Sequence, residues 1–344
     1  MVDNRVLING QEVELTADLF QPKSANKGDN EAISRPSLTF WQDARRRLVK
    51  NPGAMIGLFI ILCIVAMSFI APALSDFTYD QQNIRHSKVP PLFPVISEVG
   101  IMDGTNAEGV NVYEEKGIEE TYLFGTDSLG RDIWTRTWTG AQVSLLIALL
   151  AACFDLIIGV TYGSISGFFG GKVDIVMQRI IEVIAGIPSL VLVILFMMVF
   201  EPGIMSIAMA MAVSGWIGMS RIVRSHVLRL KDREFVLASR TLGSSNFRLI
   251  TKHLFPNIAG PILVSIMFSL PSAIFYEAFL SFIGLGLQPP SASLGVLISE
   301  GYQSLQNYPY MLILPSIVLC LLIFSFNLLA DGLRDAVDPQ MRNQ

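Results

Sequence analysis

Three acidic residues lie inside long apolar stretches of the sequence: Asp155, Glu182 and Glu277. A carboxylate at membrane depth is costly, so such groups usually face the protein interior or a water-filled path. We expect Asp155 and Glu277, together with Tyr276, to line a translocation path. For Glu277 the alternative is burial against polar groups of a neighbouring helix. For Glu182 the favoured interpretation is a pair with Arg179.

No set of residues in the sequence indicates catalysis. The three histidines are isolated, and each of the three cysteines lies in an apolar run without a CxxC or Cys/His cluster. A nucleophile, base and metal-ligand constellation is absent. The phosphate-binding pattern Gly-x-x-x-x-Gly-Lys-Ser/Thr is also absent, so this chain cannot bind nucleotide phosphates in that way. We therefore expect no enzymatic activity, no metal, no cofactor bound by this chain and no nucleic-acid partner.

The elements that carry these residues are apolar helices. Hydrophobic residues make up 51% of the 344-residue chain and charged residues only 16%, against about 25% charged in a soluble domain. A bilayer core needs roughly 20 residues of helix. The apolar stretches predict an all-α integral membrane protein with six transmembrane helices, at about 54–74, 141–166, 174–200, 203–219, 258–283 and 310–329.

Basic residues indicate the orientation of these spans, because Lys and Arg concentrate in cytoplasmic loops. They cluster before the first span and between the fourth and fifth spans. Residues 76–120 instead hold nine Asp and Glu, and residues 284–309 contain no Lys or Arg. We expect both termini in the cytoplasm.

The same patterns divide the chain into segments. Residues 38–50 are amphipathic, which predicts an interfacial helix or, equally, a plain basic anchor. Residues 76–138 are too polar to span. Their apolar residues predict a fold against the outer mouth, with a loose insertion as the alternative; these residues are Ile96, Val99, Ile101, Tyr113 and Tyr122. The expected segments are a mobile cytoplasmic tail (1–37), the interfacial helix (38–50), the first span (51–75), the extracytoplasmic segment (76–138), a core with the other five spans (139–334) that includes a cytoplasmic loop (221–256), and a cytoplasmic tail (335–344).

The cytoplasmic loop predicts two short amphipathic helices that meet at Gly243. The first shares a face of Phe235, Ala238 and Leu242, and the glycine caps its end. Ser244, Ser245 or Asn246 can begin the second helix, with Phe247, Ile250 and Leu254 on one face and Pro256 as its end. Such an elbow would transmit motion to the flanking spans. The alternative is a solvated basic loop that only sets orientation.

A second local motif, Gly125-Thr126-Asp127-Ser-Leu-Gly130-Arg131-Asp132, precedes the second span. Thr126 or Asp127 can cap a helix, Gly130 permits a tight turn, and Arg131 can pair with Asp132. We expect a structural clamp here, with contact to substrate or to a binding protein as the alternative.

The loop resembles the signature loop of ABC importer permeases, in which Ala238, Gly243 and Pro256 match in register while the flanking Glu, Ile and Leu positions do not. Further runs resemble the dipeptide/oligopeptide permeases, specifically their second permease subunit. These runs cover 46–52, 124–132, 167–174, 277–290 and 326–335. One departure is Leu294-Gly295, where a Trp is expected before the glycine.

This resemblance implies a type I importer permease in a prokaryotic plasma membrane. It implies that the elbow docks on a cytoplasmic ATPase; the coupling residues would be Glu234, Ala238, Arg240, Gly243, Ser244, Arg248 and Pro256. The implied partners are a homologous second permease subunit, two ATPase subunits that bind ATP and Mg, an extracytoplasmic peptide-binding protein and membrane lipid. The long external segment favours oligopeptides as substrate, with dipeptides or nickel as alternatives. An ATP-independent carrier or channel is the alternative of another class.

Overall fold

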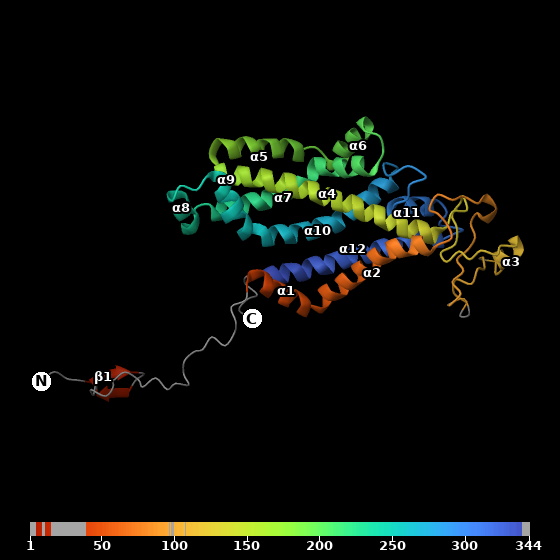
Figure 1. Ribbon diagram of the computed structural model, residues 1–344, viewed down its shortest axis with the longest axis horizontal. Helices are drawn as coiled ribbons and strands as arrows, with labels where there is room; N and C mark the ends of the chain where they lie inside the picture. Colours follow the sequence, from red (N-terminus) through yellow and green to blue (C-terminus); the bar gives the residue numbers. More distant parts are fainter. Residues whose placement is uncertain are drawn as a thin grey trace. The chain divides into compact units, whose positions relative to one another are not determined.

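The computed structural model describes residues 5–8, 11–14, 39–95, 97, 100–106 and 108–338 (Figure 1). Strands β1 (Arg5–Ile8) and β2 (Gln11–Glu14) pair antiparallel. This hairpin was not expected, because residues 1–37 were predicted to be a tail; the remainder of that segment lies outside the described residues. The sequence signal is Asn9-Gly10 between the two strands, since this dipeptide favours a two-residue hairpin turn.

Apart from residues 75–132, which are mostly turns and irregular structure, the rest of the described chain is mainly helical. Five helices are long and apolar enough to cross a membrane, and a sixth span results if the bent pair α5–α6 is counted as one. The predicted helical membrane fold is therefore confirmed. The helices are α1 (Phe40–Lys50), α2 (Pro52–Leu74), α3 (Val112–Lys116), α4 (Ile133–Phe169), α5 (Gly171–Ala185), α6 (Ser189–Val199), α7 (Ile204–Leu230), α8 (Glu234–Thr241), α9 (Asn246–Arg248), a π-helical turn (Leu249–Leu254), α10 (Phe255–Phe282), α11 (Leu294–Gln303) and α12 (Tyr310–Val337).

Side-chain caps determine where the first long helices begin. Asn51 accepts a hydrogen bond from the Ala54 amide at 3.2 Å and precedes Pro52 at the start of α2. Asp132 accepts from the Thr135 amide at 2.8 Å, so α4 begins at Ile133, within the segment expected to be extracytoplasmic. With 37 residues, α4 is roughly 55 Å long and exceeds the bilayer core.

The third predicted span is broken. Helices α5 and α6 are bent by 82° at the three residues between them, Gly186 to Pro188. Proline lacks an amide donor and disfavours helical geometry in the residue before it. Pro188 therefore separates two helices where one continuous span was expected at about 174–200.

Small residues bring α4 and α7 together side by side (Figure 1). A Cβ atom added to Gly163 would overlap the carbonyl oxygen of Ser220, and one added to Gly159 would lie 2.7 Å from Met219 Cβ. Because lipid provides no hydrophobic force between helices, such close backbone contact supplies the packing.

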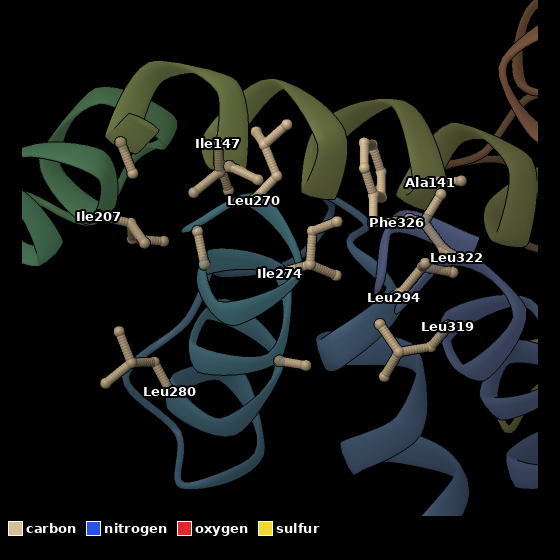
Figure 2. Packing of buried hydrophobic residues seen from close by; sticks show 14 of the residues in the cluster. Ala141, Ile147, Ile207, Leu270, Ile274, Leu280, Leu294, Leu319, Leu322 and Phe326 are labelled. Atoms are coloured by element: carbon tan, nitrogen blue, oxygen red, sulfur yellow. The ribbon is translucent and has the colours of Figure 1, made fainter. Parts of the chain in front are cut away.

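The largest core cluster joins seven helices, and Figure 2 shows part of it. Its buried apolar side chains come from α2, α4, α6, α7, α10, α11 and α12, so the core crosses most of the bundle. Labelled members are Ala141, Ile147, Ile207, Leu270, Ile274, Leu280, Leu294, Leu319, Leu322 and Phe326.

The segments expected to be loops contain more helix than the sequence indicated. Helix α7 continues to Leu230, inside the expected loop 221–256, and α12 continues to Val337. Helix α11 occupies part of the segment between the last two spans, with Ser293 as its cap. The residues beyond 338 lie outside the described part of the chain.

Residues 76–132 have a small core of their own. Val89 and Tyr122 are buried with Val112, Tyr113 and Ile118. Of the other apolar residues expected to need cover, Ile101 is 58% exposed, and residues 96 and 99 are outside the described residues. This part of the chain and α8 lie at opposite ends of the helical bundle (Figure 1).

Candidate functional site

The elbow at Gly243 has the hydrogen bonds of a left-handed helix cap. Gly243 has a φ of +83°. Its amide donates to the Arg240 carbonyl at 3.0 Å, and the next amide, of Ser244, donates to the Ser239 carbonyl at 3.1 Å. These two bonds end α8 in a Schellman motif, which favours glycine. A Cβ atom added to Gly243 would meet no atom within 4 Å, so the space around it is open in this chain.

The second arm of the elbow is continuous with α10. Ser245 caps α9 by accepting from the Arg248 amide at 3.4 Å. The π-helical turn then leads directly into α10, with Pro256 in the first turn of that helix. The expectation that Pro256 ends the second helix is therefore wrong. A proline in the first turn of α10 is tolerated because its missing amide is not required there.

One side of the elbow is anchored in the bundle. Val236, Leu249 and Leu254 are fully buried with residues of α7 and α10. Phe247, predicted to share a face with Ile250 and Leu254, is 78% exposed, whereas Leu254 is fully buried. Leu249 and Leu254 are five residues apart, the repeat of a π turn, and not three or four.

The other side of the elbow is apolar and open. Phe235 and Ala238, predicted to share a face with Leu242, are exposed, and Leu242 is 87% exposed. Phe247 on the second arm is exposed as well, so both arms present apolar side chains that the described chain does not cover.

Polar contacts join the two arms. Ser239 Oγ lies 2.9 Å from Ser244 Oγ and 3.1 Å from His253 Nε2. The Arg240 guanidinium lies 5.6 Å from the centre of the Phe168 ring.

Of the predicted coupling residues, Ser244 is half-buried; the exposed ones are Glu234, Ala238, Arg240, Gly243, Arg248 and Pro256. The role of His253 was not foreseen.

A cavity of about 630 Å³ opens between α4, α7 and α10. Asp155 and Tyr276, two predicted path residues, line it. Within the described chain, Asp155 Oδ1 and the Tyr276 hydroxyl are buried without a hydrogen-bond partner. The cavity can therefore receive a polar group.

Glu277, the third predicted path residue, is not part of the cavity lining. Its carboxylate is fully buried and accepts hydrogen bonds from Ser144 Oγ and Ser281 Oγ, both at 2.9 Å. Ser144 Oγ also accepts from the Leu294 amide at 3.2 Å. The network ties α4, α10 and α11 together, as the alternative interpretation of Glu277 described. The contact between Ser281 and Glu277 could have been predicted from the sequence, because residues four positions apart on a helix are neighbours.

Glu182 is away from this cavity. It forms an ion pair with Arg179 at 2.5 Å, and both side chains are exposed on α5. This is the pairing that the sequence favoured.

The motif from Gly125 to Asp132 folds as a tight turn against residues 83–89. Asp127 Oδ1 accepts from the amides of Leu129 and Arg131 at 2.9 and 3.0 Å. The Thr126 hydroxyl accepts from the Val89 amide at 2.8 Å. A Cβ on Gly130, whose φ is +72°, would overlap the backbone of Asn83. Only glycine fits this turn.

Two arginines connect this turn to α11. Arg131 Nε donates to Asp127 Oδ2 at 2.5 Å, while Arg131 Nη2 and Arg136 Nη2 lie 2.9 and 3.1 Å from Glu300 Oε2. The expected pair of Arg131 with Asp132 is wrong, because Asp132 instead caps α4. Burial raises the pKa of Asp132 above its usual range, outweighing the hydrogen bonds from Thr135.

Comparison with known proteins identifies the family. Residues 159–343 match the family described as binding-protein-dependent transport system inner membrane component. The chain belongs to this permease family. Residues 39–91 also match the N-terminal transmembrane domain of oligopeptide transport permease C. The predicted class of ABC importer permease, and its location in a bacterial plasma membrane, are confirmed.

Relatives match nearly the whole permease. It is 44% identical over 325 residues to the oligopeptide transport system permease protein OppC of Bacillus subtilis, covering 94% of this chain and 98% of that one. It is also 44% identical over 338 residues to the dipeptide transport system permease protein DppC of Lactococcus lactis, covering 95% and 98%. A solved MetNI methionine ABC transporter chain is 19% identical with a TM-score of 0.48, covering 58% of this permease and 94% of that chain.

Sequence reasoning missed several residues of the permease that complete these sites. Glu300 lies 164 positions from Arg136, and Ser144 lies 133 positions from Glu277. Gly215 leaves room for the Asp155 carboxylate, as a Cβ there would lie 2.5 Å from Oδ1. Only Arg136 carries a sequence signal, as a charge in the first turns of an apolar helix.

Proposed function

We propose that this permease forms half of the translocation path for oligopeptides in an ABC importer and receives the motion of an ATPase through the elbow around Gly243. The observation that carries the proposal is the two-sided elbow. Val236, Leu249 and Leu254 anchor it to the bundle, whereas Leu242 and Phe247 are exposed. A partner that grips the exposed side would move the anchored side with it.

The elbow connects to the wall of the cavity. Helix α10 follows the second arm without a break and contributes Ser269, Ser272 and Tyr276 to the lining. Helix α7 precedes α8 and contributes Gly215 and Met219. Displacement of the elbow would therefore change the cavity between α7 and α10.

The remaining parts of the importer would be separate chains. We infer a homologous second permease subunit, two ATPase subunits that bind ATP and Mg, and an extracytoplasmic peptide-binding protein. This chain would not be catalytic, since the sequence lacks a phosphate-binding loop. The basic residues before α2 and after α7 support a cytoplasmic location for the elbow and both termini.

The test of coupling is Gly243→Leu in the assembled importer. Leucine is strained at a φ of +83° by about 1–2 kcal/mol, and its side chain would enlarge the surface that enters the ATPase. We expect peptide uptake to fall at least about tenfold while ATP hydrolysis continues, which corresponds to about 1.4 kcal/mol of lost coupling.

Gly243→Asn is the matched control, because asparagine tolerates the left-handed conformation. It should retain more uptake than Gly243→Leu at equal amounts of complex in the membrane. Normal ATP-driven uptake by Gly243→Leu would refute the role of the elbow. Uptake by the purified chain alone without ATP would instead favour the carrier or channel.

Dipeptides are a second candidate substrate. The supporting observation is that the dipeptide permease of Lactococcus lactis is as similar to this chain as the oligopeptide permease of Bacillus subtilis, at 44% identity each. The two candidate substrates therefore differ in peptide length, and the same transport mechanism would apply to both.

A further inference from the structure

The Asp155 carboxylate faces a cavity and has no ionic partner. Asp155 takes part in none of the ion pairs among the described residues. Its Oδ1 atom and the Tyr276 hydroxyl also lack hydrogen-bond partners in that part of the chain. Buried polar groups are nearly always hydrogen-bonded. A group from outside the described chain can therefore complete these two atoms.

The absence of a side chain at Gly215 leaves a defined space for the Asp155 carboxylate. A Cβ at this residue of α7 would lie 2.5 Å from Asp155 Oδ1 and 2.8 Å from Oδ2. A larger residue would displace the carboxylate. The glycine thus allows the acid to lie against α7 at the cavity wall.

Serines of α10 add hydrogen-bond acceptors to the lining of the same cavity. Ser265, Ser269 and Ser272 donate their hydroxyl hydrogens to carbonyls of the preceding turn at 2.9, 2.9 and 3.0 Å. A hydroxyl has one hydrogen and two lone pairs. In this arrangement the lone pairs of these three serines remain for a molecule in the cavity, which favours a ligand with hydrogen-bond donors.

Arg334 is the other charged residue of the lining. It is exposed in the last turn of α12, at the end of the bundle where α10 begins (Figure 1). Water screens an exposed charge. Asp155 is the acidic residue among the lining side chains.

We propose that Asp155, with Tyr276 and the hydroxyl oxygens of Ser265 and Ser269, binds a protonated primary amine of the transported substrate. An ammonium group brings one positive charge and three donors, which match a carboxylate and neighbouring acceptors. The amino terminus of a peptide and a lysine side chain both supply this group. The inference rests on the proposed translocation function, because only a transported molecule would enter the cavity.

The experiment uses a cysteine at Ser272, which lines the cavity and is exposed. Ser272→Cys is introduced into the complete importer after Cys63→Ala, Cys153→Ala and Cys320→Ala remove the native thiols. The thiol is modified with a cationic trimethylammonioethyl or an anionic sulfonatoethyl methanethiosulfonate. Each rate is divided by the rate of the same reagent with a small free thiol, and these normalised rates are compared throughout. We expect the normalised rate of the cationic reagent to be about tenfold higher because a carboxylate lines the same cavity. We also expect n-butylammonium to slow the reaction more than NaCl at equal ionic strength.

Asp155→Asn should remove both the preference for the cationic reagent and the protection by butylammonium, and Asp155→Glu should retain part of each. Glu182→Gln is the matched control, since it neutralises a carboxylate outside the lining and should change neither. Equal rates for the two reagents, with no protection beyond NaCl, would overturn the amine site. Protection by NaCl equal to that by butylammonium would also overturn it.

Uptake distinguishes this failure from failure of the proposed path. If modification of the Ser272→Cys importer blocks uptake but shows no charge preference, the path stands and the amine site is refuted. If the introduced thiol is unreactive with both reagents and uptake is normal, the path and the amine site are both refuted.

Discussion

At the residue scale, Glu277 and Asp155 show two fates of a carboxylate in an apolar helix. Glu277 receives hydrogen bonds from two serines and is fully buried. Asp155 has an unpartnered oxygen at a cavity. The first arrangement stabilises the bundle, and the second leaves capacity for a ligand.

Replacement of Glu277 tests the first of these roles. Glu277→Ala would leave Ser144 and Ser281 without their partner and open a void, at a cost of about 2–4 kcal/mol. Glu277→Gln keeps the volume and one acceptor oxygen, so it should lose less. The measurement is thermal unfolding of the purified complex in detergent. A Glu277→Ala variant as stable as Glu277→Gln would contradict the network.

At the element scale, the turn at Gly125–Asp132 acts as a clamp in the structure. It contacts residues 83–89 through Thr126 and Gly130, and it reaches α11 through Arg131 and Glu300. The contacts hold the beginning of α4 to two other segments. They support the structural interpretation of the motif over direct contact with substrate.

Glu300→Ala tests the clamp. It would leave two buried arginines, Arg131 and Arg136, with Asp127 as their remaining acidic neighbour. Loss of one partner of a buried ion pair lowers the free energy of unfolding by about 3–5 kcal/mol. We expect faster proteolysis of residues 76–132 and a lower unfolding temperature. Glu108→Ala, an exposed change in the same segment, is the control. Unchanged proteolysis with lost stimulation by the binding protein would favour the contact interpretation.

At the scale of the whole molecule, the elbow and residues 76–132 lie at opposite ends of the bundle (Figure 1), with the cavity on helices that connect to the elbow. This arrangement suits the proposed transporter, in which an ATPase would act at the elbow and a binding protein would deliver substrate at the other end. Its cavity of about 630 Å³ is within the range of ligand-binding pockets.

Uptake of peptides of graded length tests the substrate proposal. Cells that lack this chain, complemented with it, should take up peptides of three to five residues more effectively than dipeptides. The measurement is competition against one labelled peptide, with the Gly243→Leu variant as the blank. Preferential uptake of dipeptides would contradict the oligopeptide proposal and favour dipeptides as the substrate.

The sequence by itself determined the helical membrane fold and the family, because the length of an apolar run and a short motif are local properties. Gly243 was also predictable, since a glycine between two short helical patterns marks a left-handed cap. The π-helical turn and the position of Pro256 were not, because α10 is apolar on all sides, so its sequence pattern does not mark where the helix begins.

Only the tertiary structure decided which acidic residue lines the cavity. Asp155 and Glu277 both lie in apolar helices, and their difference depends on Gly215 and Ser144, which are distant in sequence. The same holds for Arg131 and Glu300, 169 positions apart. A helix within a membrane can present any face to its neighbours without a change in composition, so these pairings come from packing alone.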